Sequence, residues 1–125
     1  MMKFVPLLRC RDMQEAVSFY TRILGFRLQY DESPATEAVI DLVLDDAELQ
    51  LSMFEGPMNP GIAVNVWVDD ADALFEKFLS RGLDISGKMN SPVHQGPVDQ
   101  TWGTREFYVT DPSGNTLRFR ERVTK

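Results

Sequence analysis

The feature that most constrains the fold of this chain is a capped helix that occurs twice. Asp12-Met13-Gln14-Glu15 carries the N-cap and N3 residues of a capping box, and apolar residues at helical spacing follow up to Gly25. A second amphipathic helix begins at Asp69 or Asp70 and ends at Gly82. The two glycines stand 57 residues apart, as do the first cap and Asp69. The pattern predicts an internal repeat of about half the chain.

Each predicted helix follows one strand-like segment and precedes three more. The leading segments are FVPLLR and IAVNVWV. Alternating apolar runs predict the following strands near 26–31, 37–44 and 48–54 in the first half and near 83–87, 104–110 and 115–121 in the second. The sequence therefore predicts an α+β fold of two βαβββ modules, about 1–57 and 60–125, in a single domain.

Two connections stand out in this plan. Asp45-Asp46 is the expected tip of a hairpin. The segment from Gly87 to Gly103 is rich in Gly, Pro and Asn, and its length is unusual for a compact domain unless it covers something.

Composition excludes several classes of partner. At 125 residues the chain is long enough for one domain with a real core. The formal charge of -6, without a Lys/Arg cluster, argues against nucleic acid. The sequence contains neither a run of about 18 apolar residues nor a signal-peptide pattern, so we expect a cytoplasmic protein that does not enter membranes. The single cysteine, Cys10, excludes an internal disulfide.

Alternation along the strands separates an apolar face from a second face of mixed character. Successive side chains of a strand point to opposite sides of the sheet. Leu49, Leu51 and Met53 form one row, and Glu48, Gln50 and Ser52 form the other. The second face combines polar and aromatic side chains, which is typical of a small-molecule pocket but also fits a wetted face or a dimer interface. Its members include Asp41, Gln50, Asn65, Trp67 and Arg118.

Three phrases, RDMQEAVSFYTRILGF, VNVWVDDADALFEKFLSRG and WGTREFYVTDPSGNTLRF, extend this pattern over nearly the whole chain. With them the chain resembles the vicinal oxygen chelate superfamily of glyoxalase I, extradiol dioxygenases, fosfomycin resistance enzymes and bleomycin resistance proteins. The resemblance implies that the two modules pair into a curved mixed sheet that cups a ligand, often completed by a second subunit.

The resemblance also identifies where enzymes of that superfamily keep metal ligands. These are His, Glu or Gln side chains on the first and last strands of each module. The corresponding residues here are Val5, Gln50, Ala63 and Arg118. Because one donor does not retain a metal and a guanidinium repels it, the resemblance implies no metal, no cofactor and no catalytic residue.

Bleomycin resistance proteins, which bind the drug in grooves between two subunits, are the members that this chain resembles most. Pro6 matches a proline at the hinge where their N-terminal strand passes to the partner subunit. Arg105-Glu106-Phe107 matches their Gly-Arg-Glu-Phe run, although Thr104 separates Gly103 from Arg105. The resemblance implies a homodimer, with strand exchange at Pro6 left open.

Several residues have two open interpretations. Arg118 pairs with Glu48, Glu106 or Asp41, or else contacts the ligand through its planar fork. Aromatic side chains either line the groove or hold loops and interfaces, and these are Phe54, Trp67, Trp102 and Tyr108. His94 is expected to be an exposed loop residue, and Cys10 a buried inert thiol.

Three hypotheses for function follow from these observations. The first is a metal-free dimer that sequesters a bleomycin-like antibiotic or a similar aromatic or cationic molecule. The acidic residues Asp41, Asp45, Asp46 and Glu48 would attract a cation. The second is a glyoxalase- or dioxygenase-like enzyme with an atypical metal site on Gln50 and His94, and the third is a dimeric scaffold with a vestigial groove. The lost metal donors favour the first.

Overall fold

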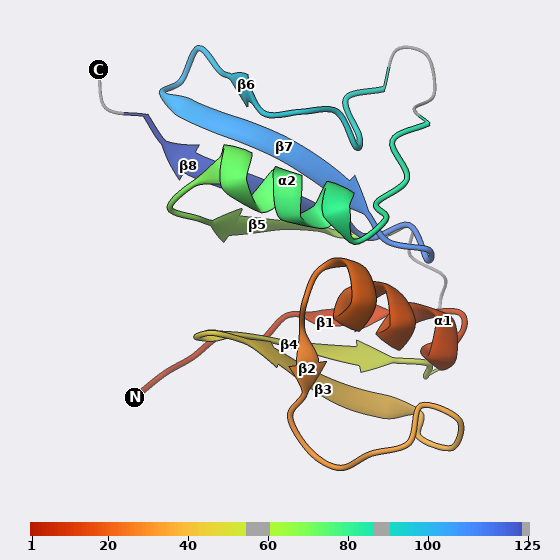
Figure 1. The fold of residues 1–125 in the computed structure, drawn as a ribbon. Coiled ribbons are helices and arrows are strands. Elements are labelled where there is room, and N and C mark those ends of the chain that lie inside the picture. Colours follow the sequence, from red (N-terminus) through yellow and green to blue (C-terminus); the bar gives the residue numbers. More distant parts are fainter. Residues whose placement is uncertain (55–60, 87–90, 124–125) are drawn as a thin grey trace. The chain divides into compact units, whose positions relative to one another are not determined.

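The computed structural model describes residues 1–54, 61–86 and 91–123 (Figure 1). The chain divides into two compact units. Unit 1 consists of Met1–Ile62 with Asp111–Asn115, and unit 2 consists of Ala63–Thr110 with Thr116–Lys125. The expected module boundary near residues 57–60 falls largely outside the described residues, and the union of both modules in a single domain stays a prediction.

Unit 1 is a βαβββ module. Its sheet has the strand order β1-β4-β3-β2, in which β1 runs parallel to β4 and the other neighbours are antiparallel. Figure 1 shows α1 on one side of this sheet. The elements are β1 (Leu7–Arg9), α1 (Met13–Ser18), the π-helical turn η1 (Phe19–Ile23), β2 (Arg27–Leu28), β3 (Val39–Leu44) and β4 (Ala47–Ser52).

Unit 2 repeats the same plan. Its strand order β5-β8-β7-β6 matches that of unit 1 position by position, again with one parallel pair, β5 and β8. The helix α2 lies across β7 and β8 (Figure 1). The elements are β5 (Ala63–Trp67), α2 (Ala71–Ser80), β6 (Val98–Asp99), β7 (Thr104–Thr110) and β8 (Thr116–Arg122). The predicted α+β fold of two βαβββ modules is confirmed.

Both predicted helix caps are present. The carboxylate of Asp12 accepts a hydrogen bond from the N–H of Glu15, and that of Asp70 accepts one from Ala73, each at 3.0 Å. With Asp70 as the second cap, the caps are 58 residues apart, whereas Gly25 and Gly82 are 57 apart. The first helix therefore holds one more residue, which the wider π-helical turn η1 accommodates.

Strand ends differ from the expected bounds, and one expected strand is wrong. Residues 83–86 form no strand, while residue 87 lies outside the described part. There the carboxylate of Asp84 accepts hydrogen bonds from the N–H and the hydroxyl of Ser86, a local turn that competes with a strand ladder. In unit 2 the strand that completes the four-stranded sheet is instead the short β6. In unit 1 the strand expected at 26–31 is present only as the two-residue β2.

The cores lie between each helix and its sheet. In unit 2 the rings of Phe107 and Phe119 stack at 4.9 Å, and Phe78 of α2 packs edge-on against both. In unit 1 the predicted row is buried at Leu49 and Leu51 but not at Met53, which lies beyond the end of β4 and is 40% exposed. Ser52, expected on the polar face, is buried as well.

The turn Asp111–Asn115 joins β7 to β8 in the chain but belongs to unit 1. Asn115 accepts from the N–H of Ile62 at 3.2 Å and donates to the carbonyl of Arg9 at 2.8 Å. The buried hydroxyl of Tyr20 donates to Asp111 at 2.8 Å. A Cβ on Gly61 would lie 1.9 Å from the carbonyl oxygen of Gly114, so this approach requires glycine. The turn therefore closes unit 1 as well as the hairpin.

Candidate functional site

The sheet of unit 1 brings together two of the expected site residues. Asp41 of β3 and Gln50 of β4 are cross-strand partners, and the Gln50 amide donates to the Asp41 carboxylate at 3.1 Å. Both are half-buried on the side of the sheet opposite the buried Leu42, Leu49 and Leu51. A polar pair on this face can orient a ligand. The hydrogen bond between the two side chains already uses one donor of Gln50 and one acceptor of Asp41, so only their remaining groups are available to a ligand.

The sheet of unit 2 brings together three more expected residues in one cross-strand row. Asn65 of β5 lies beside Arg118 of β8, which lies beside Tyr108 of β7. Trp67 follows on the same side, next to Arg120. We call this side, away from α2, the open face of unit 2. Its side chains combine rings, guanidinium groups and an amide, as the alternation predicts.

A buried carboxylate organises the open face of unit 2. Glu106 of β7 is 2% exposed, and its Oε1 accepts hydrogen bonds from the Tyr108 hydroxyl at 2.9 Å and from Arg118 at 3.1 Å. Its Oε2 accepts three further hydrogen bonds, from the Trp102 indole N–H, the Thr104 hydroxyl and the Arg120 guanidinium. These five donors and Glu106 form the Glu106 cluster.

The Glu106 cluster keeps its carboxylate ionised. Burial by itself raises the pKa of Glu106, because a charge is poorly solvated away from water. The hydrogen bonds that the carboxylate accepts outweigh burial and lower the pKa to about 2. A buried charge with five donors is well satisfied, so Glu106 acts as a fixed anion and not as an acid.

The cluster shows what Arg118 does. Of its three expected partners, Arg118 forms an ion pair with Glu106. The other two have different partners: Glu48 pairs with Lys3 at 3.2 Å, and Asp41 accepts a hydrogen bond from Gln50. The Arg118 guanidinium also lies 5.3 Å from the centre of the Tyr108 ring. Its side chain is still 34% exposed, so the internal ion pair leaves part of the planar fork accessible.

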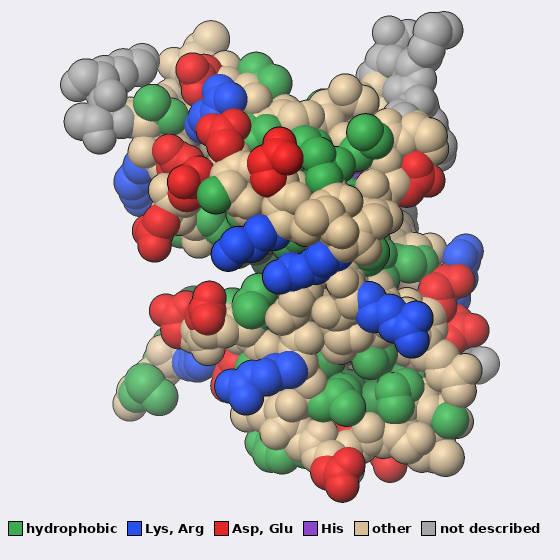
Figure 2. Space-filling model, viewed as in Figure 1, with side chains coloured by type: hydrophobic (Ala, Val, Ile, Leu, Met, Phe, Trp, Pro, Cys, Tyr) green, Lys and Arg blue, Asp and Glu red, His purple; other side chains and the backbone are tan. Residues whose placement is uncertain are grey.

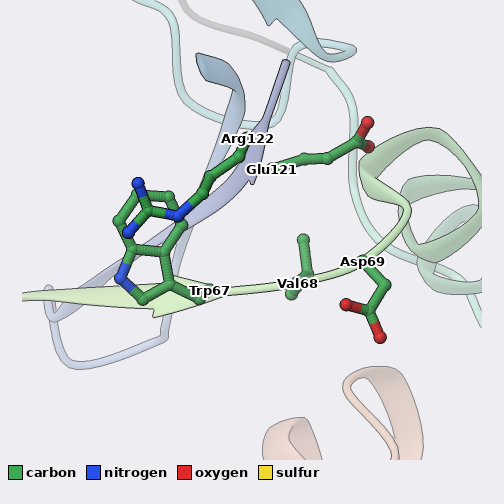
Figure 3. A pocket seen from close by; sticks show the side chains of 5 residues that line it. All are labelled: Trp67, Val68, Asp69, Glu121 and Arg122. Carbon is green, nitrogen blue, oxygen red and sulfur yellow. The ribbon is translucent and has the colours of Figure 1, made fainter. Parts of the chain in front are cut away.

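Two more arginines cover the exposed tryptophan of β5. The guanidinium carbons of Arg120 and Arg122 lie 4.7 and 4.2 Å from the centre of the Trp67 ring. Figure 3 shows the Arg122 guanidinium stacked over the indole. Trp67 remains 50% exposed. Cation–π contacts of this kind hold the arginine fork flat against the ring.

A shallow cavity of about 240 Å³ adjoins this stack at the end of β5 and β8. It is lined by Trp67, Val68, Asp69, Glu121 and Arg122 (Figure 3). The Glu121 carboxylate accepts from the N–H of Ala71 at the start of α2, at 2.7 Å. The cavity is smaller than the roughly 300 Å³ at which drug-sized pockets begin, so it can hold part of a ligand.

The remaining expected residues lie apart from these rows. Trp102, just before β7, is 57% exposed and is tied to the Glu106 cluster by its indole N–H. Phe54 follows β4 and is 65% exposed. Pro6 directly precedes β1, and its carbonyl accepts from the N–H of Gln50 at 2.9 Å.

His94 lies in a loop, as expected, but it is not exposed. The side chain is half-buried, and Nε2 accepts from the N–H of Thr110 at 3.0 Å. Nδ1 lies 2.6 Å from the carbonyl of Asp84, so it carries the proton and donates. The His94 backbone N–H donates to the backbone carbonyl of Tyr108 at 2.8 Å. His94 therefore pins the connection before β6 to the edge of β7.

The expected burial of Cys10 is confirmed. The residue is 6% exposed. Burial, reinforced by the nearby Asp111 and Asp12 carboxylates, raises the pKa of the thiol to about 11. The thiol is therefore protonated at neutral pH, as an inert buried cysteine requires.

The positions that the resemblance assigns to metal ligands do not fit a metal ion. Leu7 pairs with Gln50 in unit 1, and Asn65 pairs with Arg118 in unit 2. Leu7 and Asn65 are 58 residues apart, the same separation as the two helix caps. Gln50 and Arg118 are thus equivalent positions in the two sheets. The other two positions hold Val5 and Ala63. Within residues 1–54, 61–86 and 91–123, no group of three or more His, Cys, Asp or Glu side chains could hold an ion.

Sequence reasoning did not single out Glu106, Thr104 and Arg122 as parts of a common face. The signal was present in the alternation of TREFYVT, which places Thr104, Glu106 and Tyr108 on one side, and of TLRFRER, which does the same for the three arginines. A central buried carboxylate could not be inferred from either strand alone, because its donors come from both.

Acidic side chains lie over α2 on the face of unit 2 that Figure 2 shows. Asp72 of α2 pairs with Arg105 of β7 at 2.9 Å. Arg105 on the helix side is therefore paired with a carboxylate, while the open face of unit 2 carries Arg118, Arg120 and Arg122. Among the described residues, no helix has both the length and the hydropathy needed to cross a membrane.

Comparison with known proteins identifies relatives of the whole chain. A family model described as Glyoxalase/Bleomycin resistance protein/Dioxygenase superfamily matches residues 4–119. No curated protein matches significantly.

Solved structures match the fold over almost the full length of the chain. TioX from Micromonospora sp. ML1 is 26% identical with a TM-score of 0.73, covering 98% of this chain and 100% of that one. A bleomycin-binding protein complexed with bleomycin is 22% identical with a TM-score of 0.76, covering 98% and 99%. Lactoylglutathione lyase from Agrobacterium tumefaciens is 15% identical with a TM-score of 0.69, covering 96% and 92%. Binding proteins and enzymes thus share this fold.

Proposed function

Because the chain belongs to the Glyoxalase/Bleomycin resistance protein/Dioxygenase superfamily, we propose that it is a metal-free binding protein that sequesters a small aromatic molecule. The observation that carries this proposal is the occupancy of the four metal-ligand positions by Val5, Gln50, Ala63 and Arg118. Such a set offers one neutral oxygen donor and one cation, which does not retain a divalent ion.

The ligand-binding residues of this proposal are side chains of the two polar sheet faces together with Phe54 and Trp102, which lie just outside the strands. Exposed aromatic side chains supply apolar area for affinity, and the polar groups fix orientation. Trp67 and Trp102, each half-exposed or more, are the main anchors. The full proposed set is Asp41, Gln50, Phe54, Asn65, Trp67, Trp102, Tyr108 and Arg118.

The site is proposed to lie in a groove at a homodimer interface. The exposed N-terminal segment of this chain supports an interface, since Phe4 is 89% and Val5 is 43% exposed. The bleomycin-binding protein of the same fold supports a small-molecule ligand. Pro6 would be the hinge at which this segment passes to the partner subunit. The cytoplasmic location and a role in antibiotic resistance belong to the same proposal.

Tryptophan fluorescence tests the proposal directly, because both tryptophans of the chain lie at the proposed site. Titration with bleomycin and a panel of aromatic and cationic compounds should change the emission saturably at one site per chain. The variants Trp67→Phe and Trp102→Phe should show how much of the emission change each tryptophan contributes. A flat response from every compound would contradict sequestration and favour a scaffold with a vestigial groove.

The atypical enzyme has less support. Its suggested donors were Gln50 and His94, but the Gln50 amide is bonded to Asp41 and both ring nitrogens of His94 are bonded to backbone groups. A metal at His94 would have to replace one of these hydrogen bonds.

A further inference from the structure

The open face of unit 2 carries an excess of positive charge. Arg118, Arg120 and Arg122 alternate along β8 and therefore point to the same side of the sheet. In the described part of the chain, Glu106 is the carboxylate that contacts this row, and it pairs with the first two. Three cations against one anion leave the face cationic on a chain with a net charge of -6.

Arg122 is the least neutralised of the three. Its guanidinium stacks on Trp67, and in the described part of the chain no carboxylate forms an ion pair with it. The neighbouring Glu121 carboxylate is held by the N–H of Ala71, and Asp69 points away from the stack (Figure 3). The Arg122 side chain is exposed, so its N–H donors are available to a ligand.

The aromatic groups of the face select for a flat partner. The Trp67 indole is half-exposed, and the Arg120 and Arg122 forks lie against it. A planar ring can stack on the accessible part of the indole and present an acidic group to the guanidinium N–H donors in a bidentate geometry. A cationic ligand would instead meet two guanidinium groups already placed on that ring, and like charges at contact distance repel.

We infer that the open face of unit 2 binds a planar aromatic carboxylate, with Trp67 as the stacking surface and Arg122 as the charged contact. This inference rests on the proposed function and names the ligand class that this part of the site takes. It differs from the expectation of a cationic ligand, which the acidic side chains of unit 1 suggested.

Three probes that share the naphthalene ring and carry an anionic, a neutral or a cationic substituent test the inference: 2-naphthoate, 2-naphthalenemethanol and 2-naphthylmethylammonium. Isothermal titration at low salt should show that the naphthoate binds at least about tenfold more tightly than the ammonium, a difference of about 1.4 kcal/mol. Added salt should weaken the binding of the naphthoate and leave the binding of the alcohol unchanged.

Two variants identify the contact. Arg122→Gln should weaken naphthoate at least about fivefold and leave the alcohol unchanged, since a charge-assisted hydrogen bond is lost without loss of the stack. Arg105→Gln is the matched control, because it removes the same charge from the α2 side, where Arg105 pairs with Asp72 and Asp99. It should leave all three affinities unchanged.

The outcomes separate the inference from the proposed function. Tighter binding of the ammonium, or equal weakening by both variants, overturns the assignment of an anionic ligand while sequestration stands. Absence of binding by all three probes and by the wider panel overturns both. If Arg122→Gln instead shifts the monomer–dimer balance in sedimentation without changing probe affinity, the face is covered by a second copy and the inference is wrong.

Discussion

Replacing Glu106 by Gln should destabilise the protein more than any surface charge change. The substitution keeps the size of the side chain but removes the charge that five donors share, and it turns one acceptor into a donor facing N–H groups. The two arginines that pair with it remain on the sheet, 34% and 20% exposed, without their partner.

The pKa of Glu106 sets the size of the effect. It lies at about 2, against an ordinary 4.5, for a side chain that is fully buried. At about 1.4 kcal/mol per pH unit, the ionised carboxylate contributes roughly 3 kcal/mol to the free energy of unfolding at neutral pH. This agrees with the range of about 3–5 kcal/mol for breaking a buried pair by removing one partner.

The sign of the pH dependence follows from the lowered pKa. A depressed pKa contributes stability above the unfolded value of about 4.5, and the contribution is lost as the pH falls through the folded value of about 2. The difference between wild type and Glu106→Gln should therefore be roughly 3 kcal/mol at pH 7 and roughly 1 kcal/mol at pH 3.

Urea denaturation at the two pH values measures this difference. Glu48→Gln is the control, since Glu48 forms a partly exposed pair with Lys3 and should cost less than about 1 kcal/mol. Glu106 is not a stabilising buried anion if Glu106→Gln costs as little as the control at pH 7, or if its cost at pH 3 equals its cost at pH 7.

Three further predictions concern the turn, the thiol and the assembly. Asn115→Ala should lower the free energy of unfolding by about 2–3 kcal/mol in urea, because the N–H of Ile62 and the carbonyl of Arg9 lose their partner; a cost below about 0.5 kcal/mol would mean that the turn does not hold unit 1. Cys10 should react with a disulfide reagent at pH 8 far more slowly in the native protein than in urea, since its pKa is about 11; equal rates would show an accessible thiolate. Sedimentation at micromolar concentration should show a dimer, and a monomer would remove half of the proposed groove.

The sequence predicted the repeat and most of the strands because these depend on local chemistry. Both caps are Asp residues at the head of an apolar periodicity, and β7 coincides with the expected 104–110. The error at residues 83–86 arose because Asp84 and Ser86 interrupt a short apolar segment and form hydrogen bonds with each other. A two-residue strand such as β6 carries too little alternation to be recognised.

The candidate site was predicted as a set of residues but not as a set of contacts. Alternation places Arg118 on the polar face, yet its partner depends on the register between β7 and β8, which sets Tyr108 beside it and Glu106 beside Arg120. The same holds for His94, whose ring nitrogens form hydrogen bonds with backbone groups 10 and 16 residues away in the sequence. Contacts that depend on tertiary register cannot be derived from one strand.

Whether the protein holds a metal can be measured by mass spectrometry of the divalent metal content of the purified protein, prepared without a chelator. Because Val5, Ala63 and Arg118 occupy three of the four donor positions, we expect far less than one ion of any first-row metal per chain. One tightly held Ni, Zn, Fe or Mn ion per chain would contradict this expectation and make metal-dependent catalysis the better explanation.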